Sequence, residues 1–257
     1  MVKSLAERLW HARAWQEKIA LNGAVAPNTE DEAYSIQKEV HEFSDETIIG
    51  WKIGATTSQG MAALGLQRPF VGPLFGDDIF ASGDKISILK GDLLETEIAI
   101  EIGSDLAAMN SNHSRHQIFQ CISAVYPAFE IVRSRFASEV PVTPWNVIAD
   151  GGGNEAVVLG NRIGAPVETA LENIAMTLKL DGKEAVTSST DVLVWDHVYD
   201  AVNWLLDHEM FKDRGLRSGD IIMTGSCTGF ADLAEVSYAE ANVEGIGSVD
   251  AAFAIST

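Results

Sequence analysis

Hydrophobic and polar residues alternate most regularly over residues 93–102, in the segment LLETEIAIEI, and this alternation predicts a β-strand. Successive side chains point to opposite faces of a strand, so one face would be aliphatic apart from a threonine, and the other acidic. The aliphatic face would carry Leu94, Thr96, Ile98, Ile100 and Ile102, and the acidic face Glu95, Glu97 and Glu101. The Cβ atoms of Glu95 and Glu97 would lie roughly 7 Å apart, which suits two ligands of one divalent cation. Taken alone, the pattern is more typical of the solvated face of an amphipathic strand.

The N-terminal part shows helical spacing. Apolar residues recur every three or four positions from residue 4 to about residue 21, and Asn22-Gly23 predicts the end of this helix. A second helix is expected after Asn28-Thr29, with glutamates in its first turn that suit the helix dipole. Residues 47–54 then predict a strand that carries Lys52 between two apolar side chains.

Residues 65–84 are rich in Gly, Pro and Asp and predict a long loop with short extended pieces. We take this loop as the boundary between a small N-terminal α/β part, residues 1–84, and a catalytic mixed-sheet domain, residues 85–257. A strand over 85–89 precedes the glutamate-bearing strand, and a helix is expected from about residue 115 to 125.

The C-terminal half predicts mainly short strands with turns. Asp181-Gly182 between two alternating segments indicates a hairpin. One helix is expected over about 198–209, a strand over 221–224, and two strands around a turn at Gly245 and Gly247. The chain is therefore expected to be an α+β protein in which β-structure dominates.

Charge and composition limit the kinds of molecule and surface that the protein is expected to bind. The formal net charge is −19 with the acidic residues spread along the chain, which disfavours nucleic acid and anionic membrane surfaces. No apolar stretch approaches the roughly 18 residues of a membrane span, and the N-terminus carries charges where a signal peptide is apolar. The two cysteines lie far apart and are expected to be reduced thiols in a cytoplasmic protein.

Glu130 is a carboxylate in the middle of an apolar run, residues 124–132. Burying an ionised carboxylate costs several kcal/mol unless a positive group answers it. Arg133 or Arg135 is one candidate partner, and a metal ion shared with Glu95 and Glu97 is the other. Three carboxylates without a convincing His or Cys set would select Mg²⁺ or Mn²⁺ over zinc.

Two further features offer polar groups to such a site. Lys52 in its apolar strand needs a carboxylate partner or a lowered pKa if it is buried, unless it extends to the surface. The segment TGSCTG, residues 224–229, follows a strand and can present hydroxyl and N–H groups to a carboxylate. Residues 151–156 match a dinucleotide-binding pattern, but a strand follows them instead of the required helix.

Taken together, these segments resemble the 2-keto-4-pentenoate hydratase and 4-oxalocrotonate decarboxylase family of the fumarylacetoacetate hydrolase superfamily. The matching pieces occur in the order of the family and span nearly the whole chain. They are Asp31–Gln37, Gly50–Gly54, Glu95–Glu97, Tyr126–Val132, Ile148–Asp150 and Gly219–Ser226.

The resemblance implies a layered-sheet fold of the fumarylacetoacetate hydrolase C-terminal-domain type with a small helical N-terminal part. It implies Mg²⁺ or Mn²⁺ bound by Glu95, Glu97 and Glu130, and a homo-oligomer. It implies hydration of a 2-hydroxydienoate or 2-oxo-enoate, such as 2-keto-4-pentenoate, in meta-cleavage degradation of aromatic compounds. Lys52 would act at the reacting carbon chain with Asp78 as an acid/base partner. The expected substrate-binding residues are Gly54, Asp150, Thr224, Ser226 and Thr228.

Two departures from the family pattern concern the pocket. The family carries an Asn-Ala-Ser-Ser-like run where this chain has Gly151-Gly-Gly-Asn154, and Arg133 stands where an acidic residue is common. Three alternatives therefore stay open: a 4-oxalocrotonate-type decarboxylase on the same metal site, hydrolytic C–C cleavage, and a metal-binding relative without turnover. Hydrolysis ranks lowest of the enzymatic options, because no well-placed His is evident to activate water.

Overall fold

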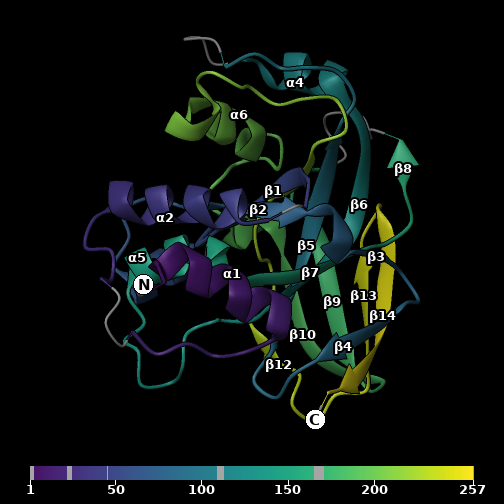
Figure 1. Cartoon of the computed structure of the whole chain (residues 1–257). Helices are drawn as coiled ribbons and strands as arrows, with labels where there is room; N and C mark the ends of the chain where they lie inside the picture. The colour runs from purple at the N-terminus through teal and green to yellow at the C-terminus, as the bar shows by residue number, and fades with distance from the viewer. Residues whose placement is uncertain (1–2, 22–24, 45, 109–112, 165–170, 257) are drawn as a thin grey trace.

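A computed structural model describes residues 3–21, 25–44, 46–108, 113–164 and 171–256. It shows two β-sheets and two groups of helices (Figure 1). The α-helices of the described part are α1 (Leu5–Trp15), α2 (Glu30–Glu42), α3 (Ser58–Leu64), α4 (Arg115–Cys121), α5 (Pro144–Ala149) and α6 (Asp200–Asp207).

The larger sheet is mixed and contains the strand that the alternation predicts. Its order is β2 (Phe70–Phe75), β1 (Ile48–Gly54), β11 (Ile221–Met223), β5 (Leu93–Ile102), β6 (Ile122–Val132), β7 (Asn154–Leu159) and β3 (Ile79–Ala81). Two short strands join it, because β12 (Ala231–Asp232) pairs with β5 and β8 (Ile163–Gly164) pairs with β6. Helices α1, α2 and α5 lie beside strands β1 and β2, and helices α4 and α6 lie at one end of the long strands β5 and β6 (Figure 1).

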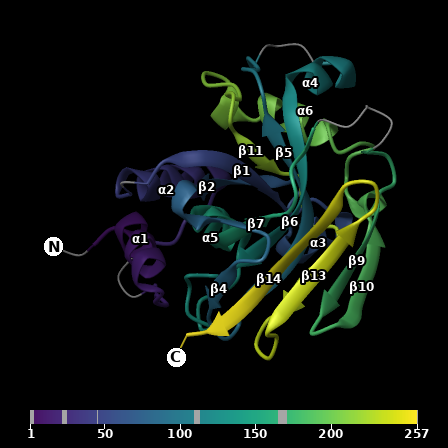
Figure 2. The same ribbon diagram turned by 90° about the vertical axis from the view of Figure 1, so that its right-hand side faces the viewer.

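The smaller sheet covers one part of the larger sheet, as the turned view shows (Figure 2). Its order is β10 (Lys183–Ser189), β9 (Ala175–Leu180), β13 (Tyr238–Val243), β14 (Gly247–Ile255) and β4 (Lys85–Ile88). The predicted hairpin at Asp181-Gly182 is confirmed by the antiparallel pairing of β9 with β10.

The aliphatic face of β5 is buried along its whole length, but against two different partners. Leu94 packs with Phe129 and Val249 in the core between the two sheets. Ile98 and the two isoleucines beyond it belong to a second core that includes the buried face of α6. Each such aliphatic side chain contributes about 1.5–3 kcal/mol on burial, so this strand is held firmly in one register.

The N-terminal helices cover the open edge of the larger sheet. Gln37 of α2 donates through its side chain to the carbonyls of Val71 on β2 (2.9 Å) and Ile148 on α5 (2.7 Å). The Tyr34 hydroxyl accepts from the N–H of Val71 at 3.0 Å. Backbone groups of an edge strand are thereby satisfied by side chains, which blocks pairing with another chain.

The predicted fold class and most predicted elements are confirmed, with differences in extent. The first helix ends at Trp15 and not near residue 21, because Gln16 is left-handed (φ 55°) and Ile19 pairs with Phe136 instead. The predicted stop at Asn22-Gly23 lies outside the described residues. The helix expected over 115–125 ends at Cys121, since the following apolar run is a single long strand, β6.

Residues 65–84 contain more regular structure than the predicted loop. They include β2, whose six residues are all buried, and β3. Strands β1, β2 and β3, which precede residue 85, belong to the same sheet as β5 and β6. The division of the chain at residue 84 stays a prediction. None of the helices in the described part combines the length and apolarity that a membrane-spanning helix needs.

Candidate metal centre

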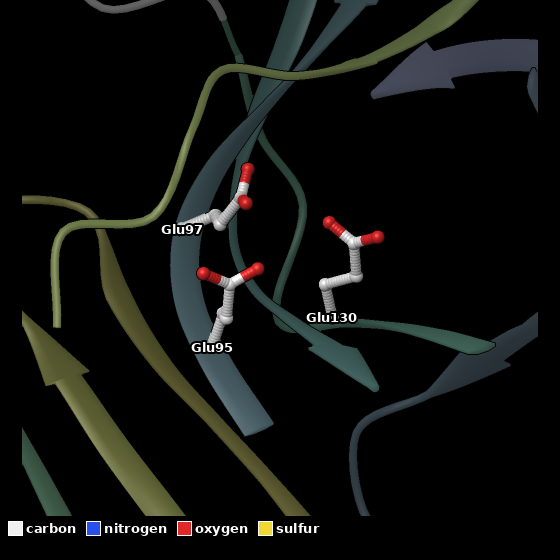
Figure 3. Close-up of side chains that lie close together, drawn as sticks. All are labelled: Glu95, Glu97 and Glu130. Carbon is white, nitrogen blue, oxygen red and sulfur yellow. The ribbon is translucent and has the colours of Figure 1, made fainter. Parts of the chain in front are cut away.

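Strand pairing brings the three candidate glutamates together. Glu95 on β5 lies directly across from Glu130 on β6 in the antiparallel register, and Glu97 follows two residues along the same face of β5. One carboxylate oxygen of each lies within 4.8 Å of those of the other two, and all three side chains are buried. Figure 3 shows the carboxylates turned toward a common centre. We call Glu95, Glu97 and Glu130 the glutamate trio.

The trio is short of positive charge. Burial, together with the charge of Glu130, raises the pKa of Glu95 to about 7, although the charge of Lys52 acts to lower it. Burial, reinforced by the charges of Glu130 and Glu95, raises the pKa of Glu97 well above its ordinary value. Three buried carboxylates with one ammonium leave an excess of about two negative charges when ionised. Their oxygen-only donor set and this charge excess fit a hard divalent cation.

Lys52 is the basic side chain that partly compensates the negative charge of the trio. It lies on β1 and is 3% exposed, with Nζ 2.9 Å from Glu130 Oε1 and donating to Gly152 O at 3.2 Å. Burial acts to lower the pKa of Lys52, but the charges of the glutamate trio outweigh it, so this pKa lies above its usual value. Lys52 is therefore a buried, charged ammonium and does not extend to the surface.

The triple-glycine segment forms the wall beside Lys52. Gly152 is left-handed (φ +72°), and a Cβ there would lie 2.7 Å from a Phe70 ring carbon and 3.0 Å from Lys52 Cε. A larger residue would collide with the lysine or the ring. Gly152 thus leaves room for the lysine side chain, and its backbone carbonyl accepts a hydrogen bond from Nζ.

The segment after β11 contacts the trio through its backbone. Gly225 N–H donates to Glu97 Oε2 at 2.8 Å, whereas the Ser226 hydroxyl is buried without a hydrogen-bond partner among the described residues. The Thr224 hydroxyl instead donates to Ile98 O at 2.8 Å. The Thr228 hydroxyl accepts from Thr96 N–H at 3.0 Å. Both threonine hydroxyls therefore anchor the segment to β5, and substrate contacts for these residues stay predictions.

The remaining predicted site residues have other neighbours. Gly54 packs against the Phe70 ring, which a Cβ would approach to 2.2 Å. Asp150 accepts from the Arg135 N–H at 2.8 Å, and burial raises its pKa to about 6. Asp78 forms an ion pair with Arg13, although burial still raises its pKa. Within the described residues, neither aspartate forms a hydrogen bond or ion pair with Lys52 or the trio.

The arginines proposed as alternative partners of Glu130 are engaged elsewhere. Arg133 pairs with Asp92 at 2.6 Å and with Glu155, and Arg135 pairs with Glu155 at 2.6 Å. Within the described residues, the side chains that form an ion pair or hydrogen bond with Glu130 are Lys52 and Asn154, whose Nδ2 donates to Oε1 at 3.1 Å. Sequence reasoning missed Asn154, whereas the Gly225 N–H confirms the expectation that residues 224–229 present N–H groups to a carboxylate. The signal for Asn154 was its place at the end of the glycine run, where β7 begins.

The raised pKa of Glu95 predicts an unusual pH dependence of stability. A carboxyl whose pKa rises from 4.5 to about 7 on folding contributes stability below pH 4.5 and loses it as pH rises through 7. This rise corresponds to about 3 kcal/mol at pH 8, so metal-free Glu95→Gln is expected to melt roughly 6–12 °C above wild type at that pH. The difference should shrink as pH falls through 7 and vanish near 4.5. Thermal denaturation in chelator measures it, and a pH-independent difference would contradict the assignment.

The fold and site define a class: mixed-sheet proteins that gather buried carboxylates beside an ammonium, a setting built for a hard divalent cation. Residues 68–254 match the family model described as fumarylacetoacetate (FAA) hydrolase C-terminal. This chain belongs to that family, and the resemblance seen in its sequence is confirmed.

Named relatives cover nearly the whole chain. The 2-keto-4-pentenoate hydratase of Burkholderia vietnamiensis is 28% identical over 98% of this chain and 97% of that protein. The 2-oxo-hept-4-ene-1,7-dioate hydratase of Escherichia coli is 28% identical over 87% of each.

Solved structures share the fold. That of 4-oxalocrotonate decarboxylase from Pseudomonas putida G7, complexed with magnesium and adipate, has a TM-score of 0.87 and 24% identity. The similarity extends over 97% of this chain and 96% of the decarboxylase chain. Fumarylpyruvate hydrolase from Pseudomonas aeruginosa, in complex with Mn²⁺ and pyruvate, has a TM-score of 0.63 and 18% identity over 83% and 93% of the two chains.

Proposed function

We propose that this protein is a metal-dependent lyase, a hydratase that adds water to a 2-hydroxydienoate or 2-oxo-enoate such as 2-keto-4-pentenoate. The observation that carries the proposal is the glutamate trio with the Lys52 ammonium 2.9 Å from Glu130. The names of the relatives across nearly the whole chain support the same reaction class. We place the reaction in the degradation of aromatic compounds by meta-cleavage.

The trio would hold Mg²⁺ or Mn²⁺. Its donors are carboxylate oxygens alone, without the nitrogen or sulfur ligands that favour zinc. Glu130 Oε2 is buried and has no hydrogen-bond partner among the described residues, which leaves it free to act as a ligand. Magnesium keeps several of its waters, so three protein ligands leave positions for a substrate.

Each part of the site has its own role in the proposed reaction. When bound, the cation supplies Lewis acidity toward the carboxylate and C2 oxygen of a 2-oxo or 2-hydroxy acid. Lys52 has three N–H donors, of which two are directed to Glu130 Oε1 and Gly152 O. The third can orient the substrate and assist proton transfer as the dienol becomes an α,β-unsaturated ketone, to which water adds. Gly225 N–H keeps Glu97 in place.

The proposal extends to partners. A small 2-oxo or 2-hydroxy acid is the expected substrate, and the net charge of −19 argues against nucleic acid. A homo-oligomer in the cytoplasm completes the proposal. Asp78 as an acid/base partner and Gly54, Asp150, Thr224, Ser226 and Thr228 as substrate-binding residues are part of it as well.

A 4-oxalocrotonate-type decarboxylase is the second candidate. The fold similarity to the decarboxylase of Pseudomonas putida G7, at a TM-score of 0.87 over nearly all of both chains, favours it. The same trio and lysine would serve both reactions, because each builds negative charge on the C2 oxygen of the substrate.

Two substrates distinguish the candidates. The protein is incubated with 2-hydroxypenta-2,4-dienoate or 2-hydroxymuconate, with Mg²⁺ or Mn²⁺ and with chelator. Metal-dependent loss of dienol absorbance without CO₂ identifies the hydratase, and CO₂ release from 2-hydroxymuconate identifies the decarboxylase. Absence of turnover on both, with metal still bound, would contradict the proposal and leave a metal-binding relative without turnover.

A further inference from the structure

The two oxygens of Glu130 lie in unequal surroundings. Oε1 receives Lys52 Nζ at 2.9 Å and Asn154 Nδ2 at 3.1 Å, whereas Oε2 has no hydrogen-bond partner among the described residues. The Glu130 side chain is fully buried, so solvent does not even out this difference. A buried polar atom is normally paired, so an unpaired carboxylate oxygen in a cluster of three buried carboxylates calls for a cation.

Asn154 is held so that its amide reaches Glu130. It opens β7, which pairs with β6, and it is 2% exposed. Its backbone carbonyl accepts from Arg13 Nη1 at 2.6 Å and from Arg135 Nη2 at 2.7 Å. The amide nitrogen faces the carboxylate because an amide oxygen there would repel it, and the amide oxygen itself has no hydrogen-bond partner in the described part of the chain. The two arginines therefore hold the backbone of Asn154 in place, and the bond to Glu130 sets the orientation of its side-chain amide.

We propose that Asn154 is a positioning residue that, together with Lys52, holds Glu130 Oε1 and so leaves Oε2 as the metal-ligand atom. The inference rests on the metal site of the proposed function and extends it to a residue that binds no metal itself. Hydrogen bonds to ligating carboxylates fix their orientation, and loss of such a partner costs about 10–100-fold in metal affinity.

The first helix takes part in this support. Arg13 of α1 contacts Asn154 O, forms an ion pair with Asp78 and lies 4.6 Å from the centre of the Phe75 ring. Arg13 precedes residues 68–254, the part that matches the family model. A segment outside the matched region thus fixes the residue that positions the third glutamate.

A shape-matched pair of variants tests the role of the amide. Asn154→Val removes the donor, and Asn154→Thr has the same shape but keeps a hydroxyl donor. Both are β-branched and suit a strand. Electron paramagnetic resonance of free Mn²⁺, without substrate, gives the dissociation constant. Asn154→Val is expected to weaken Mn²⁺ binding by about 10-fold or more, and Asn154→Thr to lie closer to wild type than to valine.

Asn146→Ala is the matched control. Asn146 is 3% exposed and donates to Pro141 O at 3.0 Å. Like that of Asn154, its amide oxygen has no partner among the residues that the structure describes, but Asn146 lies on α5. Its loss is expected to lower the melting temperature and to change the Mn²⁺ dissociation constant by less than about two-fold, since it touches no member of the trio. Equal weakening in Asn146→Ala and Asn154→Val would show a general structural effect and overturn the inference.

Wild-type Mn²⁺ affinity in a folded Asn154→Val variant would also overturn the inference. So would an Asn154→Thr variant that binds Mn²⁺ no more tightly than Asn154→Val. If the valine variant fails to fold, Asn154→Ala removes the same donor without added bulk and is held to the same expectation. Failure of the proposed function is seen separately, as absence of turnover by the wild-type protein on both substrates, whereas the Mn²⁺ dissociation constants of the variants are measured without substrate.

Discussion

Glu97→Gln is expected to lower metal-dependent turnover by more than about 100-fold while the protein still folds. Loss of a hydrogen-bond partner of a ligand alone costs about 10–100-fold, and this substitution removes a ligand charge itself. The Gly225 N–H now donates to Glu97 Oε2 at 2.8 Å, and a glutamine can offer its amide oxygen to that donor. Since the uncharged amide also relieves repulsion within the trio, the metal-free variant should be at least as stable as wild type.

Glu101→Gln is the control for this experiment. Glu101 lies on the same face of β5, but its carboxylate is occupied by Tyr126, by Ser123 at 2.7 Å and by Arg162 at 3.3 Å. Its loss should change turnover by less than about three-fold, because these contacts are structural and partly exposed. Initial rates across a Mn²⁺ series compare the two variants. Wild-type turnover in Glu97→Gln would remove Glu97 from the site.

The trio could be predicted from sequence because its signals are local. The period-two alternation of residues 93–102 assigns Glu95 and Glu97 to one face, and an apolar run with one carboxylate marks Glu130 as unusual. The pairing of β5 with β6 does the rest, since the burial of their aliphatic faces permits one register. Side-chain period and burial cost were enough to single out the three glutamates, while their convergence on one metal stayed an alternative to an arginine partner of Glu130 until the family resemblance was added.

Residues whose role depends on distant partners could not be predicted in the same way. The sequence offered Thr224 and Thr228 as free hydroxyls, but both bond to the backbone of β5, more than a hundred positions away. Asp78 and Asp150 have arginine neighbours from other elements. Strand β2 was missed because its glycine and proline resemble loop composition, although pairing with β1 and the side chains of α2 satisfy its backbone.

Lys52→Met is expected to damage both catalysis and the metal-free fold. Methionine keeps an apolar chain of similar length but removes the ammonium, so proton transfer should lose about 10²–10⁴-fold. Glu130, fully buried, would keep Asn154 as a donor but lose its compensating charge. Breaking a buried ion pair from one side costs about 3–5 kcal/mol, which corresponds to roughly 6–20 °C in the melting temperature.

The two losses in Lys52→Met should respond differently to Mn²⁺. A cation at the trio replaces the missing positive charge, so saturating Mn²⁺ should recover much of the lost stability, while it cannot supply the proton and turnover should stay low. Lys179→Met is the control, because Lys179 pairs with Glu240 at 3.0 Å on the surface, where such a pair contributes about 0–1 kcal/mol. Melting curves and initial rates, each with chelator and with Mn²⁺, separate the effects. Near-wild-type turnover in Lys52→Met would exclude the lysine from proton transfer, and a melting temperature equal to that of wild type in chelator would show that Glu130 is stabilised by another group.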